Sequence, residues 1–312
     1  MAGASEDEGV RTPRLRLPAV VAVALVALLA CSPTSGAQPT GTATTAGAAA
    51  TGAPRATSPA AVPSATAAAV TPPPVGARFD YQLGGAYPPA KGVRVVARDR
   101  TAPAAPGVYS VCYVNAFQTQ PEESGWWTSR HPGLLLRDGR GRLVEDEGWP
   151  GEHLLDTRTA AQRSALAAVV GRWVDECAAK GYRAVELDNL DSWLRSGGRL
   201  TPGGNLAYAE LLVERAHAKG LAVAQKNAPE LTAKQVRTAG FDFAVAEECQ
   251  VYDECDAYTA LHGRHVVEVE YTDNGRAAFR EACTARGRTI SVVLRDRDVV
   301  PRGQRGYVSR NC

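Results

Sequence analysis

Helical segments and short strands alternate through the second half of this chain, and few folds accommodate that order. Each helical pattern of apolar residues is followed by a glycine and then by a short apolar run of β type. The helical patterns cover residues 159–180, 205–219, 232–239 and 274–286. Because parallel strands need a crossover helix between them, this alternation predicts a parallel sheet.

The number of β-type runs favours a closed barrel over an open sheet. The runs are residues 79–84, 93–99, 108–117, 184–189, 221–227, 243–249, 266–271 and 290–295. The first three lie too close together for full helices between them, so an open sheet remains the alternative. We predict a single α/β domain over residues 78–312, a (β/α)8 TIM barrel, preceded by a signal peptide and a disordered linker.

The first 31 residues are typical of an export signal. Three arginines precede the almost wholly apolar stretch 17–30, which is too short for a membrane helix and suits a signal peptide. The stretch ends in Leu28-Leu29-Ala30-Cys31, which resembles the lipobox of bacterial lipoproteins. We therefore expect lipidation of Cys31 and an extracellular protein anchored to the outer face of the cell membrane. An ordinary secretory signal with an incidental Cys31 is the alternative, and both predict export.

Residues 32–77 are rich in Ala, Thr, Pro, Ser and Gly, and such a segment buries too little apolar surface to offset its conformational entropy. We interpret it as a disordered linker.

A formal net charge of +2 gives no indication of nucleic-acid binding. The protein is expected to be a monomer, and only the N-terminal lipid would contact a membrane.

Six cysteines remain besides Cys31, and an even number in an exported protein predicts disulfides. One pair would close a short loop, one would attach the last cysteine to the last helical segment, and the third follows by elimination. The predicted pairs are Cys249–Cys255, Cys283–Cys312 and Cys112–Cys177. Metal-binding spacings of cysteine or histidine are absent, as are phosphate-binding, dinucleotide-binding and serine-nucleophile motifs, so we predict no metal and no cofactor.

Ionisable residues stand where the predicted strands end, and this edge carries the catalytic groups of a barrel. The fourth run ends with Glu186, Asp188 and Asn189, and Asp191 lies just beyond it. Side chains of a strand alternate between two faces, so Glu186 and Asp188 share a face and Leu187 takes the other. Since apolar Leu187 suits the helix layer, we expect both acids to point into the barrel, with Asp188 at its rim.

Other strand ends are polar as well. By the same logic Glu268 and Glu270 share a face of the seventh run, whereas alternation does not choose between Glu247 and Glu248 on the sixth. The residues that we expect to bind substrate are Asp80, Gln82, Tyr113, Glu186, Asn189, Asp191, Lys226, Asn227, Glu270 and Tyr271.

Several carboxyl groups at one rim suit glycoside hydrolysis. One protonated acid donates its proton to the leaving oxygen, while a second carboxylate acts as nucleophile or base. Burial and a neighbouring carboxylate both raise the pKa of such an acid. In the alternative interpretation the acids only pair with Arg98, Lys226 or Arg295 in an internal network. Acids at four strand ends together favour a catalytic site.

A series of stretches between residues 79 and 271 carries a family resemblance. They are Phe79-Asp80-Tyr81-Gln82-Leu83, Val111-Cys112-Tyr113, Trp149-Pro150-Gly151-Glu152, Leu155-Asp156-Thr157-Arg158, Val185-Glu186-Leu187-Asp188-Asn189, Lys226-Asn227, residues 241–247, Cys249, Tyr252, Glu254-Cys255 and Val269-Glu270-Tyr271. In their order they resemble glycoside hydrolase family 114, the endo-α-1,4-polygalactosaminidases.

This resemblance implies a (β/α)8 barrel, an α-1,4-linked galactosamine polymer as substrate, and Asp188 with Glu247 as the catalytic pair. It thereby selects Glu247 over Glu248. We expect Asp188 as general acid and Glu247 as nucleophile or base, with the reverse assignment open and Glu270 in reserve. Two other functions compete with this one. A surface-anchored carbohydrate-binding protein without turnover would lack one of the two acids, and a metal-dependent polysaccharide deacetylase would need histidine ligands at a suitable spacing.

Overall fold

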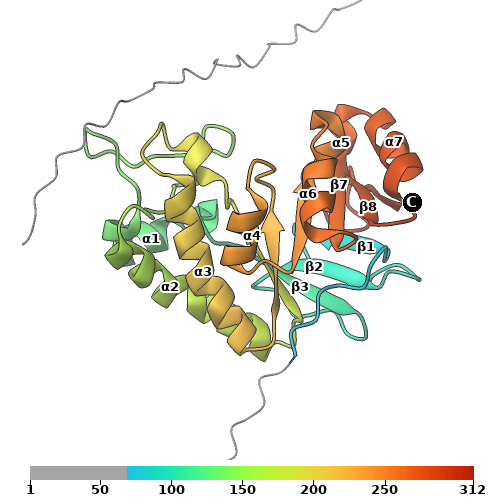
Figure 1. Cartoon of the computed structure of the whole chain (residues 1–312), viewed down its shortest axis with the longest axis horizontal. Coiled ribbons are helices and arrows are strands. Elements are labelled where there is room, and N and C mark those ends of the chain that lie inside the picture. Colours follow the sequence, from blue (N-terminus) through green and yellow to red (C-terminus); the bar gives the residue numbers. More distant parts are fainter. Residues whose placement is uncertain (1–68) are drawn as a thin grey trace, which may run out of the picture. The chain divides into compact units, whose positions relative to one another are not determined.

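The computed structural model describes residues 69–312, which form a nearly closed barrel of nine strands (Figure 1). The first eight strands are parallel and neighbour one another in chain order, which confirms the predicted TIM-barrel-like fold. The strands are β1 (Phe79–Gln82), β2 (Val95–Asp99), β3 (Tyr109–Asn115), β4 (Ala184–Asp188), β5 (Ala222–Lys226), β6 (Phe243–Glu247), β7 (Val266–Tyr271), β8 (Ser291–Arg295) and β9 (Ser309–Asn311).

The ring is closed by a side chain, with no strand ladder between β1 and β9. Strand β9 pairs antiparallel with β8, and the Asn311 amide then reaches β1. The backbone N–H of Phe79 donates to Asn311 Oδ1 at 2.7 Å, and Asn311 Nδ2 donates to the carbonyl of Phe79 at 3.0 Å. The amide thus replaces one peptide group of a strand. Strand β9 was not predicted, because three polar residues carry no recognisable strand pattern.

Four helices agree with the predicted segments, and three short ones were not predicted. The helices are α1 (Ser124–Arg130), α2 (Ala160–Ala179), α3 (Pro202–Ala218), α4 (Ala233–Ala239), α5 (Cys249–Tyr252), α6 (Cys255–His262) and α7 (Ala277–Arg286). As expected, the connections between the first three strands hold no α-helix. Within the part of the chain that the structure describes, no helix is both long and apolar enough to cross a membrane.

Local sequence signals explain where these helices begin and end. Thr159 caps α2 by accepting a hydrogen bond from the Gln162 N–H, and Thr232 with Gln235 forms a full capping box on α4. Gly240 ends α4 with φ 82°, a left-handed conformation that glycine adopts without strain. Helices α2 and α3 pack against each other along one side of the barrel (Figure 1).

All three predicted disulfides are present. Cys112–Cys177 ties β3 to α2, Cys249–Cys255 joins the starts of α5 and α6, and Cys283–Cys312 ties α7 to the residue after β9.

Packing begins before residue 78, where the linker was predicted to end. Val70 packs against the barrel core, the Tyr109 hydroxyl donates to the carbonyl of Thr71 at 2.7 Å, and Pro73 O lies 3.2 Å from His265 Nδ1. Residues 69–77 therefore contact the N-terminal ends of the strands. The predicted signal peptide, Cys31 and the rest of the linker lie outside the described residues.

Candidate active site

The barrel interior is apolar at the N-terminal ends of the strands and ionisable at their C-terminal ends. Phe79, Val95, Val111, Ala184 and Phe243 belong to one buried cluster inside the ring. Alternation along the same strands then places polar side chains on the same face nearer the C-terminal rim. These are Tyr81, Tyr113, Glu186, Asp188, Lys226, Glu247 and Tyr271.

Lys226 stands at the centre of this group. Its Nζ lies 2.7 Å from Asp188 Oδ1, 3.1 Å from Glu247 Oε2 and 3.4 Å from Glu186 Oε1, while only 3% of its side chain is exposed. Burial alone would lower the pKa of Lys226, but the three carboxylates outweigh it and raise the pKa well above the ordinary value. Lys226 is therefore a permanent positive charge within the barrel.

Three tyrosine hydroxyls complete the same pattern, one for each carboxylate. Each hydroxyl donates to its acid at 2.5 Å, and the pairs are Tyr81 with Glu186, Tyr113 with Asp188 and Tyr271 with Glu247. Each acid thus receives one phenolic hydrogen bond and shares one ammonium. Hydrogen bonds of this kind to an ionised acceptor are about twice as strong as neutral ones.

Asp188 is the acid that this environment keeps ionised. Burial favours its neutral form, but Lys226 and the Tyr113 hydroxyl outweigh that effect, and the pKa of Asp188 is lowered. Glu186, which lies deeper and is fully buried, behaves differently. Burial, reinforced by the charge of Asp188, raises the pKa of Glu186 to about 7 against the opposing effect of Lys226.

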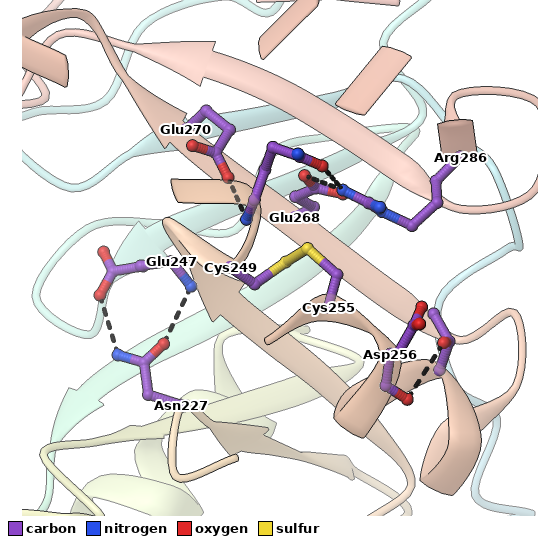
Figure 2. Close-up of a disulfide and its surroundings, with 10 residues drawn as sticks. Asn227, Glu247, Cys249, Cys255, Asp256, Glu268, Glu270 and Arg286 are labelled. Carbon is purple, nitrogen blue, oxygen red and sulfur yellow. Dashed lines mark hydrogen bonds and ion pairs between the residues drawn. A yellow bond between two sulfur atoms is a disulfide. The ribbon is translucent and has the colours of Figure 1, made fainter. Parts of the chain in front are cut away.

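Glu247 is fixed from both its backbone and its side chain (Figure 2). Asn227 Nδ2 donates to Glu247 Oε2 at 3.1 Å, and the Glu247 N–H donates to Asn227 Oδ1 at 2.9 Å. Asn227 adopts φ 49°, a left-handed conformation that asparagine tolerates well. The Glu247 side chain remains 23% exposed, against 15% for Asp188, so both acids reach the mouth of the barrel.

The two acids at the mouth are close together. Because Asp188 Oδ1 and Glu247 Oε2 both lie within reach of one Lys226 Nζ, these two oxygens are at most about 6 Å apart. Retaining glycosidases hold their carboxyl groups about 5–5.5 Å apart, and inverting ones about 6.5–9.5 Å.

A polar chain extends the site along the rim. Asn115 Nδ2 donates to Glu152 Oε2 at 3.0 Å, and Asn189 Nδ2 donates to Asn115 Oδ1 at 2.9 Å. Arg195 then donates to Asn189 Oδ1 at 3.0 Å and to Asp191 Oδ1 at 2.8 Å. The predicted residues Asn189 and Asp191 thus lie at the rim, next to Asp188.

A family comparison decides what kind of protein carries this site. The model of glycoside-hydrolase family GH114 matches residues 59–312. The chain belongs to family GH114. It is accordingly a glycoside hydrolase, as the resemblance of its strand-end motifs implied.

Solved structures show the same fold as this GH114 protein at low sequence identity. The crystal structure of Ega3 from Aspergillus fumigatus in complex with galactosamine is 21% identical, with a TM-score of 0.62 over 78% of this chain and 98% of that one. The glycoside hydrolase domain of PelA from Pseudomonas aeruginosa is 15% identical, with a TM-score of 0.52 over 73% and 96%. No curated protein sequence matches the chain significantly.

Two predicted substrate-binding residues of this GH114 chain lie outside the barrel mouth. Phe79 and Tyr81 take the interior face of β1, so Asp80 and Gln82 point to the outer face. There Gln82 Nε2 donates to Asp80 at 2.9 Å, and Arg98 Nε donates to Gln82 at 2.9 Å. Asp80 and Gln82 therefore belong to an internal hydrogen-bond network with Arg98, which is the role that the alternative interpretation gave to the acids.

Glu270, the reserve catalytic candidate, also faces outward. Val267, Val269 and Tyr271 line the interior of β7, which leaves Glu268 and Glu270 toward the helices. Glu270 Oε1 accepts the Gln250 N–H at 3.0 Å (Figure 2). Burial raises the pKa of Glu270 to about 7. Glu268 and Glu270 share a face, as predicted, but on β7 the interior face is the apolar one, the reverse of β4, so Glu270 lies away from the barrel mouth.

Glu268 completes this outer cluster, which also contains the one possible metal-binding group among residues 69–312. Arg286 Nε and Nη2 donate to its two oxygens at 3.0 and 2.9 Å. Glu268, Cys249 and Cys255 lie close enough to share an ion, but both sulfurs are engaged in a disulfide. Thiolate ligands are therefore absent from this group.

Four residues of the site were not predicted, namely Tyr81, Asn115, Glu152 and Arg195. Asn115 ends β3, which alternation could have indicated, because it shares the interior face with Tyr113. Glu152 lies in the long connection between β3 and α2, far along the sequence from any strand end. Its only sequence signal is its place in the matched stretch Trp149-Pro150-Gly151-Glu152.

Proposed function

We propose that this hydrolase cleaves α-1,4-linked polysaccharides that contain galactosamine. The observation that carries the proposal is the pair of carboxylates, Asp188 and Glu247, held about Lys226 at the mouth of the barrel. Family membership supports glycoside hydrolysis, and the galactosamine bound to the similarly folded Ega3 supports the sugar. A polymer of unacetylated galactosamine is cationic and complements a rim that is rich in carboxylates.

The closeness of the two acids favours a two-step reaction that retains the anomeric configuration. In the first step a carboxylate oxygen of Asp188 bonds to the anomeric carbon. The bond from that carbon to the glycosidic oxygen breaks, and the oxygen takes the proton of Glu247. In the second step Glu247 removes a proton from water, the water oxygen bonds to the anomeric carbon, and the ester bond to Asp188 breaks.

Asp188 and Glu247 thereby exchange the roles that were expected from the sequence. Lys226 and Tyr113 stabilise the charged form of Asp188, which a nucleophile requires and a general acid does not. Glu247 is the more exposed acid and therefore the one better placed to meet a leaving group and then water.

Incubation of the protein with an α-1,4-linked galactosamine polymer tests the proposal. We expect oligosaccharides by mass spectrometry from the wild type and from the surface control Asp175→Asn. The variant Asp188→Asn should lose at least about 10³-fold in rate, as expected for removal of a nucleophile. Proton NMR of the first product should show the α-anomer before mutarotation.

Other outcomes are equally informative. A folded wild type that binds the polymer and releases no fragments would favour the carbohydrate-binding function. An initial β-anomer would replace the two-step reaction with direct attack by water.

Export and lipid attachment at Cys31 remain part of the proposal. Three disulfides suit an oxidising compartment, which supports export. Metabolic labelling with a radioactive fatty acid should mark the wild type and leave Cys31→Ala unlabelled. Label in neither protein, with both recovered outside the cytoplasm, would favour the ordinary secretory signal.

A further inference from the structure

Glu152 is an acid beside Asp188 that the proposed reaction does not use. Its carboxyl is attached to the strand ends through Asn115, which donates to Oε2 at 3.0 Å. Asn115 is the partner of Asp188 in the register between β3 and β4. Glu152 therefore stands at the mouth of the barrel, on the β3 side of the nucleophile.

Glu152 differs from the neighbouring acids in its lack of a cation. Within residues 69–312, Lys226 pairs with Glu186, Asp188 and Glu247, and Arg195 pairs with Asp146 and Asp191. Glu152 forms no ion pair in this part of the chain, and the Asn115 amide is its only side-chain hydrogen-bond donor.

The charge of Glu152 is accordingly balanced only from a distance, by Arg195. Burial, together with the charges of Asp188 and Asp146, raises the pKa of Glu152 to about 7 in spite of the hydrogen bond from Asn115 and the charge of Arg195. A cation bound at the free oxygen would stabilise the ionised form and occupy the place that a lysine or arginine takes at the other acids.

The chemistry of the substrate supplies such a cation at the required place. The anomeric carbon must come within bonding reach of Asp188, and the amino group of galactosamine is attached to the next carbon of the ring. An ammonium group offers three donors and a full charge, whereas an acetamido group is neutral and bulkier.

We propose that Glu152 binds the 2-ammonium group of the sugar next to Asp188 and so makes the enzyme prefer unacetylated galactosamine at that subsite. This inference rests on the proposed function. Glu152 is then a specificity-determining residue, since it contacts the sugar and takes no part in bond making or breaking.

Comparison of two substrates separates this role from a structural one. The full-length protein, Glu152→Gln and Glu147→Gln are assayed on α-1,4-linked galactosamine oligomers and on their fully N-acetylated counterparts. Glutamine keeps an oxygen acceptor for Asn115, so thermal unfolding should be unchanged. Glu147 is an exposed acid of the same connection and provides the matched control.

For Glu152→Gln we expect the ratio of kcat/KM on unacetylated over acetylated oligomers to fall about tenfold or more, which corresponds to loss of about 1.4 kcal/mol. The loss should lie mainly in KM, and Glu147→Gln should behave as the wild type. In the wild type, KM for the unacetylated oligomer should fall as pH rises through about 7, and this dependence should vanish in Glu152→Gln.

An unchanged ratio in folded Glu152→Gln would overturn the inference, as would equal losses on both substrates. Wild-type protein that cleaves neither oligomer would instead overturn the proposed function, and this inference with it.

Discussion

Lys226 and Asp188 meet at 2.7 Å inside the barrel, and the same ammonium also reaches Glu247 at 3.1 Å. The lysine therefore brings two carboxylates together that would otherwise repel each other. It also keeps one of them, Asp188, ionised at a buried position. The arrangement makes Lys226 the residue on which the geometry of both acids depends.

Replacement of Lys226 by methionine should damage both stability and catalysis. The buried carboxylates would lose their shared cation, and removal of one partner of a buried charge pair costs about 3–5 kcal/mol. We expect the melting temperature to fall and the acidic limb of the pH profile of kcat/KM to move to higher pH. Lys219→Met, a change on the surface of the same protein, should leave both unchanged. An unshifted acidic limb would show that Lys226 does not set the ionisation of Asp188.

Tyr113→Phe tests the second group that lowers the pKa of Asp188. The Tyr113 hydroxyl stabilises the charged carboxylate, so its removal should raise that pKa. Because a nucleophile must be ionised, activity should then be lost at a higher pH as the solution is acidified. A shift of about one pH unit corresponds to about 1.4 kcal/mol.

Tyr109→Phe is the matched control for this variant. It removes a hydroxyl at the opposite end of β3, where that hydroxyl donates a hydrogen bond to the carbonyl of Thr71. Equal pH profiles in all three proteins would contradict the assignment of Asp188 as the ionised group.

Glu270 should act on catalysis through the backbone after Glu247. It accepts the N–H of Gln250 at the start of α5, three residues beyond Glu247 (Figure 2). In Glu270→Ala that buried N–H loses its acceptor, which costs about 1–3 kcal/mol. We expect kcat to fall about tenfold with little change in KM. Glu270→Gln keeps an acceptor oxygen and should restore kcat. If the alanine variant raised KM alone, Glu270 would belong to substrate binding, as the sequence suggested.

The three disulfides should differ in their contribution to stability according to the loops they close. Their sequence separations are 65 residues for Cys112–Cys177, 29 for Cys283–Cys312 and 6 for Cys249–Cys255. Loop-closure entropy predicts losses of about 4, 3.5 and 2 kcal/mol when each pair is replaced by alanine. Urea unfolding of the three double variants measures the order. The largest loss from the shortest loop would indicate that local packing around α5 outweighs chain entropy.

Alternation along a strand predicted which residues share a face, but not on every strand which face lies inside the barrel. On β4, Leu187 lies outside and Glu186 and Asp188 lie inside, as alternation predicted. On β7 the two acids share a face as alternation predicted, but the interior face is the apolar one, so Glu270 lies outside the barrel mouth. On β1 the ring of Tyr81 belongs to the core while its hydroxyl donates to Glu186, so Asp80 and Gln82 lie on the outer face.

Site residues outside the strands could not be predicted from the alternation of apolar and polar positions. Glu152 and Arg195 reach the rim from connections whose course depends on tertiary packing, and no periodicity marks them. The short helices α1, α5 and α6 were missed for the same reason, because four to eight residues give little helical pattern.

During translation Phe79 is synthesised long before Asn311, because 232 residues separate the two residues that close the ring. At about 5–20 residues per second, this delay lasts roughly 10–50 seconds. During that time the growing sheet carries an open edge, which invites pairing with other chains. The nascent protein should therefore depend on chaperones or on confinement until residue 311 has emerged.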